Sequence, residues 1–222
     1  QPLRNVVLTR FRNADFMVDI FAVVDYTECA IVQRALAPLE PTAILCTRES
    51  AKATHAEKVW LREGPSIQAT ASLTRESFLG QLRRVRHCAD LIDAASYNLV
   101  ARQRLDSIWQ RFEVDVEALS LPGVIWLPWG VDDWTDFYLN DRYAVGRPAE
   151  MLPYFHAYDH LLDARQWPRH QRFGELARGL TPERLWTTFL LQEGVQARVH
   201  RGICFNMAEL AHRRRVDRCR TQ

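Results

Sequence analysis

Three charged side chains alternate at the end of an apolar stretch, residues 97–106: Arg102, Arg104 and Asp106. In an extended backbone alternate residues point to the same face, so two guanidiniums and one carboxylate would lie together. Paired arginine donors suit phosphate oxygens, and a carboxylate suits a hard divalent cation or a sugar hydroxyl. Because buried charges need partners, the spacing allows two interpretations: a ligand-binding cluster or a structural Arg–Asp pair.

An acidic aromatic loop offers a second set of reactive groups. Asp132, Asp133 and Asp136 follow a short apolar run, and Trp129 and Trp134 lie among them. A carboxylate can accept a proton as a general base, and an indole ring can stack on a sugar ring. The same composition fits a solvated acidic turn whose two tryptophans enter the core, and both interpretations stay open.

His156 and His160 are four residues apart beside Asp159, so a helix would present both imidazoles on one face. A zinc site needs a third ligand, and neither an HExxH pattern nor a distant HxH pattern occurs in the chain. We therefore expect these histidines to cap a helix or to pack beside Tyr154 and Tyr158.

Strands and helices that alternate along the chain would position the charged segment on a sheet. Residues 17–25 and 42–46 are apolar and strand-like, and Thr27 can cap a helix between them that ends near Pro38. This strand–helix–strand order is typical of an α/β fold. Apolar residues at helical spacing predict a long helix over residues 78–92, directly before the charged segment.

Shorter patterns cover the rest of the chain. The sequence predicts short strands at residues 58–61, 123–128 and 195–203. It also predicts helices that begin at Pro148 and at Pro182. Two stretches stay open between alternatives: residues 5–9 fit a strand or the end of a helix, and residues 107–119 fit a helical turn or an irregular crossing.

The composition is that of an ordinary folded protein without a strong charge bias. The chain of 222 residues is long enough to bury a core, and we expect a single domain over residues 1–222. A formal net charge of +2 excludes a generally basic nucleic-acid-binding protein, so no nucleic-acid partner is expected. No apolar run reaches the length of a transmembrane helix.

The cysteines are odd in number, widely spaced and without a CxxC pair: Cys29, Cys46, Cys88, Cys204 and Cys219. This spacing argues against a disulfide framework and a zinc knuckle, and it favours a reducing compartment. We therefore expect a cytoplasmic protein. The basic tail, residues 212–215, offers peripheral contact with an anionic membrane, with a solvated basic end as the alternative.

The order of the motifs resembles a known family. A Val-Asp-Ile-Phe strand precedes a helix, a Leu-x-Pro step and a long helix with the sequence Arg-His-Cys-Ala-Asp-Leu-Ile. Three motifs follow them: Tyr97-Asn-Leu-Val-Ala-Arg-Gln-Arg-Leu-Asp106, Asn140-Asp-Arg-Tyr-Ala-Val-Gly146 and Met151-x-x-Tyr154. Over residues 15–160 this order is similar to nucleotide-sugar-dependent glycosyltransferases of GT-A-like type. Such enzymes build surface glycans in bacteria and large DNA viruses, and carry an Arg-x-Arg-x-Asp strand and an Asn-Asp-x-Phe/Tyr-Ala-x-Gly turn.

The resemblance implies both a fold and an activity. The fold would be α/β, with a GT-A-like (Rossmann-like), mostly parallel sheet flanked by helices and a helix-rich C-terminal part. Its first strand would precede Gln1 and would be missing from this chain. The activity would be the transfer of a hexosyl or deoxyhexosyl group from a UDP- or GDP-sugar to a glycan acceptor.

On the donor side, the resemblance places Arg102 and Arg104 near the diphosphate. It places Asp106 near a divalent cation, Mn²⁺ or Mg²⁺, or near the ribose. Negative charge grows on the leaving diphosphate during transfer, and a cation or arginines stabilise it. The family commonly has Asp where this chain has Asn98, and the usual Asp-x-Asp pair is absent, which puts the metal in doubt.

On the acceptor side, the Asn140–Asp141 turn would lie beside the transferred sugar or the acceptor. An inverting enzyme needs a general base, for which Asp141 is the first candidate and Asp132, Asp133 and Asp136 are the reserve. The alternative to an enzyme is a non-catalytic protein-interaction domain. In it the arginines and Asp106 form a structural network, and the tryptophans and basic tail form a partner surface.

Overall fold

The computed structural model describes residues 7–48, 53–65, 74–104, 107–129, 143–168, 186 and 189–207, with the backbone alone at 107–110, 129 and 204–207. The chain separates into two compact units. We call Gln1–Val18, Ala94–Met151 and Leu190–Gln222 the sheet unit, and Asp19–Asp93 and Leu152–Phe189 the helix unit. The single domain expected from the sequence stays a prediction, and each unit is described by itself.

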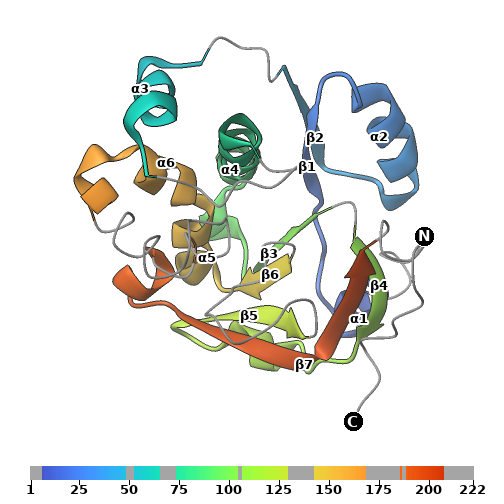
Figure 1. Ribbon diagram of the computed structural model, residues 1–222. Coiled ribbons are helices and arrows are strands. Elements are labelled where there is room, and N and C mark those ends of the chain that lie inside the picture. The colour runs from blue at the N-terminus through green and yellow to red at the C-terminus, as the bar shows by residue number, and fades with distance from the viewer. Residues whose placement is uncertain are drawn as a thin grey trace. The chain divides into compact units, whose positions relative to one another are not determined.

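The sheet unit holds a five-stranded sheet with the strand order β3-β6-β5-β7-β4 (Figure 1). Its strands are β3 (Val100–Gln103), β4 (Ser107–Phe112), β5 (Val124–Trp129), β6 (Tyr143–Gly146) and β7 (Gln196–Met207). The pairs β3–β6, β5–β6 and β4–β7 are antiparallel, and β5–β7 is parallel. The sheet is therefore mixed, mostly antiparallel and curled into a half-barrel.

The prediction of a mostly parallel, GT-A-like (Rossmann-like) sheet is wrong. Three of the four strand pairs in this sheet are antiparallel, and β5–β7 is the one parallel pair among its described strands. Most of the described residues between 148 and 192 are helical, and the long strand β7 follows them. The strands predicted at 123–128 and 195–203 exist as β5 and β7, but an apolar run does not specify the direction of its neighbours.

The core of the sheet unit lies against one face of this sheet. Phe11 of α1 (Thr9–Asn13) packs on Phe112 of β4 with ring centroids 5.6 Å apart, and Phe112 meets Tyr143 of β6 at 6.2 Å. Val145 and other apolar side chains of the strands complete this cluster. Of residues 5–9, the described residues 7–9 are helical. Residues 107–112 form β4, which neither alternative for residues 107–119 included, whereas the short 3-10 helix η4 (Glu117–Ser120) is a helical turn.

The helix unit contains a separate two-stranded parallel sheet of β1 (Phe21–Asp25) and β2 (Ala43–Thr47). The chain between them forms α2 (Cys29–Leu36) and the short 3-10 helix η2 (Ala37–Leu39). Ala22 and Val24 of β1 are buried, and α4 packs against this strand. The strand–helix–strand unit predicted from the sequence is confirmed.

The long helix predicted at residues 78–92 is confirmed as α4 (Arg75–Asp90). Thr74 caps it, since its side chain accepts a hydrogen bond from the Ser77 N–H and the Ser77 hydroxyl lies 2.9 Å from the Thr74 nitrogen. Phe78, Leu82 and Val85 are buried, as their spacing predicts.

The short strand predicted at residues 58–61 is wrong, because this stretch lies in α3 (His55–Glu63). Thr54 and Glu57 form a capping box: the Glu57 N–H donates to the Thr54 hydroxyl at 3.2 Å, and the Thr54 N–H donates to the Glu57 carboxylate at 2.6 Å. Such Thr-x-x-Glu spacing favours a helix start. Trp60 is buried and stacks on Phe78, with ring centroids 5.9 Å apart.

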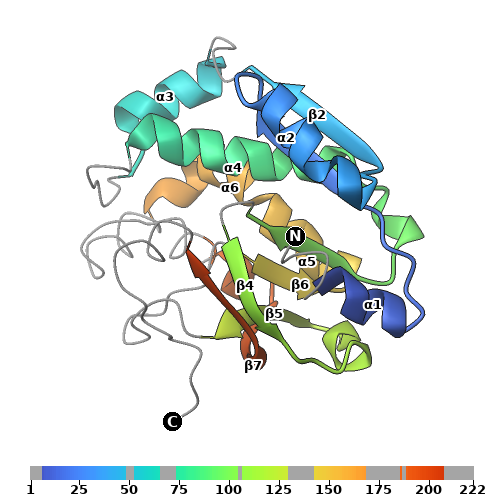
Figure 2. The ribbon, with the colours of Figure 1, turned by 90° about the vertical axis from the view of Figure 1, so that its right-hand side faces the viewer.

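The helix predicted from Pro148 is confirmed as α5 (Pro148–Phe155), followed by α6 (Ala157–Leu162). Pro153 lies inside α5, where a residue without an N–H weakens the helical hydrogen bonding, and the two helices part at His156. In the helix unit α4 packs against α3 and α6 (Figure 2). Within the described segments, no helix is both long and apolar enough to cross a bilayer.

Candidate functional site

Arg102, the first arginine of the charged segment, lies on β3 and is 8% exposed. Its cross-strand partner is Ala144 of β6. Tyr143 and Val145 point into the core of the sheet unit, so Ala144 and Arg102 lie on the opposite face. On this face the long guanidinium side chain lies beside a small side chain of the neighbouring strand.

The pairing of β3 with β6 brings two sequence motifs side by side. Gln103, the last residue of β3, is opposite Tyr143, the first residue of β6. Arg104 follows Gln103 directly and is half-buried. The predicted site residues Asp106, Asp133, Asn140 and Asp141 lie outside the described residues. The end of β3, which Asp106 follows in the sequence, is adjacent to the start of β6, which Asn140 and Asp141 precede.

Close packing fixes this part of the sheet. Gly146 is opposite Val100 on one side and Ile125 on the other. A Cβ atom at Gly146 would lie 3.0 Å from the carbonyl oxygen of Val124.

Burial raises the pKa of Tyr143 far above its ordinary value of 10, so its phenol stays protonated.

Glu150, in the first turn of α5, is a buried carboxylate that the sequence did not single out. Its Oε1 accepts a hydrogen bond of 2.7 Å from the backbone N–H of Gly123, which has a positive φ of 73°. The carbonyl of Gly123 in turn accepts from the Gln196 N–H at 2.9 Å. Glu150 therefore holds the start of β5 in place beside β7. Its place two residues after Pro148 is a typical signal of a first helical turn.

His200 on β7 is a second residue that sequence reasoning missed. Its Nδ1 accepts a 3.0 Å hydrogen bond from the Gly202 N–H, and its ring meets the edge of Trp126 with centroids 5.6 Å apart. Burial lowers the pKa of His200 below its ordinary value of 6.5, so the imidazole is neutral at pH 7. With Nδ1 as the acceptor, the ring proton resides on Nε2.

In the helix unit, Asp25 ends β1 at the carboxyl edge of the parallel pair. Its Oδ1 accepts from the Thr27 hydroxyl at 2.6 Å and from the Thr27 N–H at 2.9 Å. These bonds lower the pKa of Asp25, and the charge of Arg84 adds to the effect. Carboxyl edges of parallel strands are common ligand-binding positions in α/β proteins.

A buried network joins three helices of the same unit. Glu57 of α3 is 1% exposed, forms an ion pair with Arg83 of α4, and accepts a 2.6 Å hydrogen bond from the Tyr158 hydroxyl of α6. Burial alone raises the pKa of Glu57, but the bonds from Tyr158, from the Thr54 backbone and from Arg83 lower it overall. Every charge in this network has a partner, so its role is structural.

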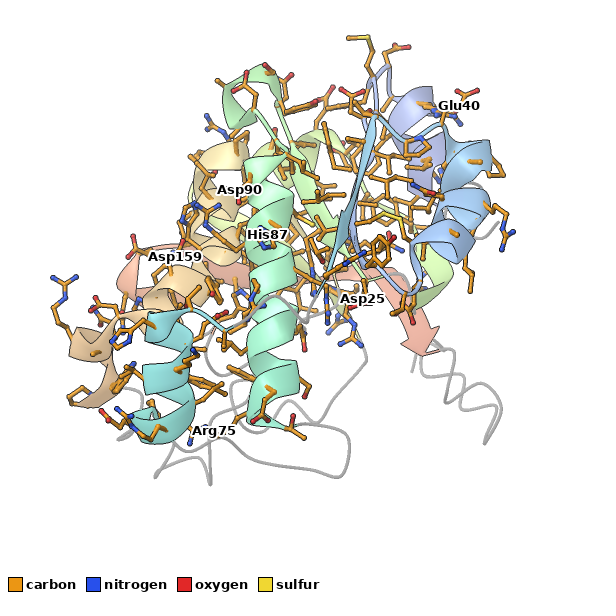
Figure 3. All side chains as sticks on the ribbon, turned by 90° about the horizontal axis from the view of Figure 1, so that it is seen from above. Asp25, Glu40, Arg75, His87, Asp90 and Asp159 are labelled. Atoms are coloured by element: carbon orange, nitrogen blue, oxygen red, sulfur yellow. A yellow bond between two sulfur atoms is a disulfide. The ribbon has the colours of Figure 1, made fainter. Side chains whose placement is uncertain are left out.

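A second, more exposed network connects α4 with α6. Arg86 donates to Asp159 at 2.8 Å and also forms an ion pair with Asp90. The two aspartates, on α6 and α4, are labelled in Figure 3. His156 Nδ1 lies 2.9 Å from the same Asp159 carboxylate. Burial lowers the pKa of Arg86, but the hydrogen bonds to both aspartates raise it overall. Arg86 therefore serves as the shared ion-pair partner of both carboxylates.

The two histidines considered as zinc ligands have other neighbours. His156 pairs with Asp159 and occupies the N-cap position of α6, and the ring of His160 packs on Phe189 with centroids 4.1 Å apart. Within the part of the chain that the structure describes, no three His, Cys, Asp or Glu side chains gather into a metal-binding set.

Comparison of the chain with models of protein families, with curated protein sequences and with solved structures finds no match.

Proposed function

We propose that this protein is a glycosyltransferase that moves a sugar from a nucleotide diphosphate sugar to a glycan acceptor. The observation that carries the proposal is the pairing of β3 with β6. This pairing places the Arg-x-Arg segment beside the segment that ends in Tyr143–Gly146. The two motifs are far apart in the sequence, and a shared site requires them to meet.

The chemistry assigns a role to each side of this junction. Sugar transfer breaks the bond between the anomeric carbon and the diphosphate, and negative charge grows on the leaving group. Arg102 and Arg104 supply positive charge there, which stabilises the transition state. Asp141, with Asp133 in reserve, takes the proton of the acceptor hydroxyl.

A divalent cation stays a prediction. Asp106, its proposed ligand, lies outside the described residues, and the described carboxylates and histidines form no metal-binding set. When bound, Mn²⁺ or Mg²⁺ would neutralise charge on the diphosphate oxygens. The nucleotide-release experiment is therefore run both with Mn²⁺ and with a chelator.

One observation favours the alternative of a non-catalytic interaction domain. Arg102 is buried and has an interaction partner within the protein, as a structural network requires. In that case the arginine contributes to stability and has no effect on nucleotide binding. The two functions therefore differ in what substitution of the half-buried Arg104 changes: ligand affinity in an enzyme, stability alone in an interaction domain.

The test is the release of UDP or GDP from a panel of nucleotide sugars, with a panel of glycan acceptors, in Mn²⁺ and in a chelator. The wild-type protein should release nucleotide from at least one donor, and Asp106→Ala should abolish the release while its circular dichroism spectrum is unchanged. If no donor releases its nucleotide, the proposed glycosyltransferase activity is wrong. Full activity of a folded Asp106→Ala variant rejects the site.

A further inference from the structure

Cys29 and Cys46 form a disulfide in the helix unit, with their Cα atoms 5.8 Å apart. Cys29 is the first residue of α2, and Cys46 is the last but one of β2. The wide cysteine spacing predicted no such bond, and for these two residues that prediction is wrong. Pairing depends on the return of β2 alongside β1, which residue spacing does not encode.

The disulfide lies at the carboxyl edge of the parallel pair. In the register of the two strands Val24 is opposite Cys46 and Asp25 is opposite Thr47. The N–H of Tyr26, the residue after β1, donates to the Thr47 carbonyl at 2.7 Å. The sulfur bridge therefore closes a covalent ring that contains α2, η2 and most of β2, and the turn between β1 and α2 directly precedes this ring.

The turn that precedes the ring is ordered by polar contacts. The Cys29 N–H donates to the Tyr26 carbonyl at 3.3 Å, and Thr27 donates twice to the Asp25 carboxylate. The guanidinium of Arg48, just beyond β2, lies 4.4 Å from the centre of the Tyr26 ring. Reduction of the disulfide would therefore affect the contacts of Asp25, Tyr26 and Thr27 that order this turn.

We propose that Cys29 and Cys46 are a reversible redox pair that locks the start of α2 onto β2 when oxidised and releases it when reduced by a dithiol. Both residues are half-buried and not enclosed in the core, and the proposal requires that a small dithiol or a dithiol protein reach the sulfur atoms. Cys29 lies at a helix N-terminus, where the backbone N–H groups favour a thiolate. The Gln33 amide nitrogen is 4.0 Å from the Cys46 sulfur and donates to it.

The exchange balances as two successive substitutions at sulfur. A thiolate of the dithiol attacks the Cys46 sulfur, and the bond to Cys29 breaks with its electron pair, so that Cys29 leaves as a thiolate and takes up a proton. The second thiol of the reductant then displaces Cys46 from the mixed disulfide. One protein disulfide and one dithiol become two protein thiols and the disulfide of the reductant.

If the bond is reversible, the order of α2 and of the turn before it depends on the redox state of Cys29 and Cys46. The bridge joins residues 17 apart in the sequence, a loop length for which a disulfide changes the unfolding equilibrium constant roughly 100-fold. Reduction should therefore speed amide hydrogen exchange in α2 and in the turn before it. This inference is independent of the proposed sugar transfer.

The test uses the whole native chain in mixtures of reduced and oxidised dithiothreitol, with alkylation of each cysteine followed by peptide mass spectrometry. Cys29 and Cys46 should become alkylated together in one two-electron transition, and amide exchange in α2 should speed up over the same range. Cys46→Ser should show fast exchange in every mixture. Cys88→Ser, which changes a cysteine outside this disulfide, should keep the transition.

Two results would overturn the proposal. Alkylation of Cys29 and Cys46 in fully oxidised dithiothreitol would mean that the bond does not form. Resistance of both residues to excess reduced dithiothreitol until the protein is denatured would mean a permanent structural disulfide. If Cys46→Ser fails to fold, the same two readouts on the wild-type chain still decide between these outcomes.

Discussion

The hydroxyl of Tyr158 donates a 2.6 Å hydrogen bond to the carboxylate of Glu57, although the two residues are 101 positions apart in the sequence. Arg83 pairs with the same carboxylate, so one buried negative charge holds α3, α4 and α6 together. Removal of one partner from a buried charge costs more than the loss of an exposed contact, because the remaining group stays desolvated. The helix unit is therefore sensitive to substitutions around Glu57.

We expect Tyr158→Phe to lower the free energy of unfolding by about 2 kcal/mol, the range for a hydrogen bond to a charged group. Urea denaturation followed by far-UV circular dichroism measures the change. Tyr26→Phe is the matched control, since it removes a hydroxyl from an exposed ring, and it should change stability by less than about 0.5 kcal/mol. Equal effects of the two substitutions would contradict the role assigned to Tyr158.

The lowered pKa of Glu57 predicts a loss of stability in acid. A carboxyl group whose folded pKa lies below its ordinary value of 4.5 binds protons more readily in the unfolded chain. Its contribution is complete well above pH 4.5 and is lost as the pH falls through that value toward the folded pKa. Unfolding measured from pH 7 to pH 3 should therefore show a steeper fall for the wild-type protein than for Glu57→Gln.

Glu63→Gln, at an exposed position of the same helix, is the control for this pH dependence. It should reproduce the wild-type slope. A Glu57→Gln variant that follows the wild-type curve at a constant offset would show that the Glu57 proton is not linked to folding.

Gly202→Ala tests the pairing of β4 with β7. A Cβ atom at Gly202 would lie 1.8 Å from the carbonyl oxygen of Glu113, whose N–H donates to the Gly202 carbonyl at 2.8 Å. The backbone must move, so we expect a loss of about 3 kcal/mol in thermal or urea unfolding. Gly123→Ala has free space but a φ of 73°, and should cost about 1 kcal/mol. The reverse order of the two costs would contradict this strand pairing.

Local patterns predicted the parts of the fold that local physics determines. The apolar spacing of Phe78, Leu82 and Val85 predicted α4, and Pro148 predicted the start of α5. The error at residues 58–61 came from reading apolar composition while the Thr54–Glu57 capping signal was present. That signal is local too, and it predicts the helix correctly.

Strand direction was not predictable in the same way. The predicted parallel unit of β1, α2 and β2 is confirmed. The same pattern does not hold for the strands of the five-stranded sheet, most of which pair antiparallel. β3 lies beside β6 and β4 beside β7, and these are long-range choices made by packing of the whole sheet. For the same reason the sequence showed the spacing of Arg102 and Arg104 but not the Glu150–Gly123 hydrogen bond, the burial of His200 or the Cys29–Cys46 bond.

Arg104→Gln separates a ligand-binding arginine from a structural one. If Arg104 contacts the donor diphosphate, the substitution removes a charge-assisted hydrogen bond and should weaken UDP or GDP binding about 10-fold or more, with a small change in melting temperature. Arg12→Gln, at an exposed position of α1, should leave affinity unchanged. A fall in melting temperature without any loss of affinity would favour the interaction domain.

The most direct measurement of the central claim is isothermal titration of the wild-type chain with UDP and GDP, each with Mn²⁺ and with a chelator. A nucleoside diphosphate site where β3 meets β6 predicts saturable binding at one site per chain. It also predicts that the ligand at 100 times its Kd stabilises the protein by about 2.7 kcal/mol. Absence of binding by both nucleotides under both conditions would contradict the assignment of this protein as a glycosyltransferase.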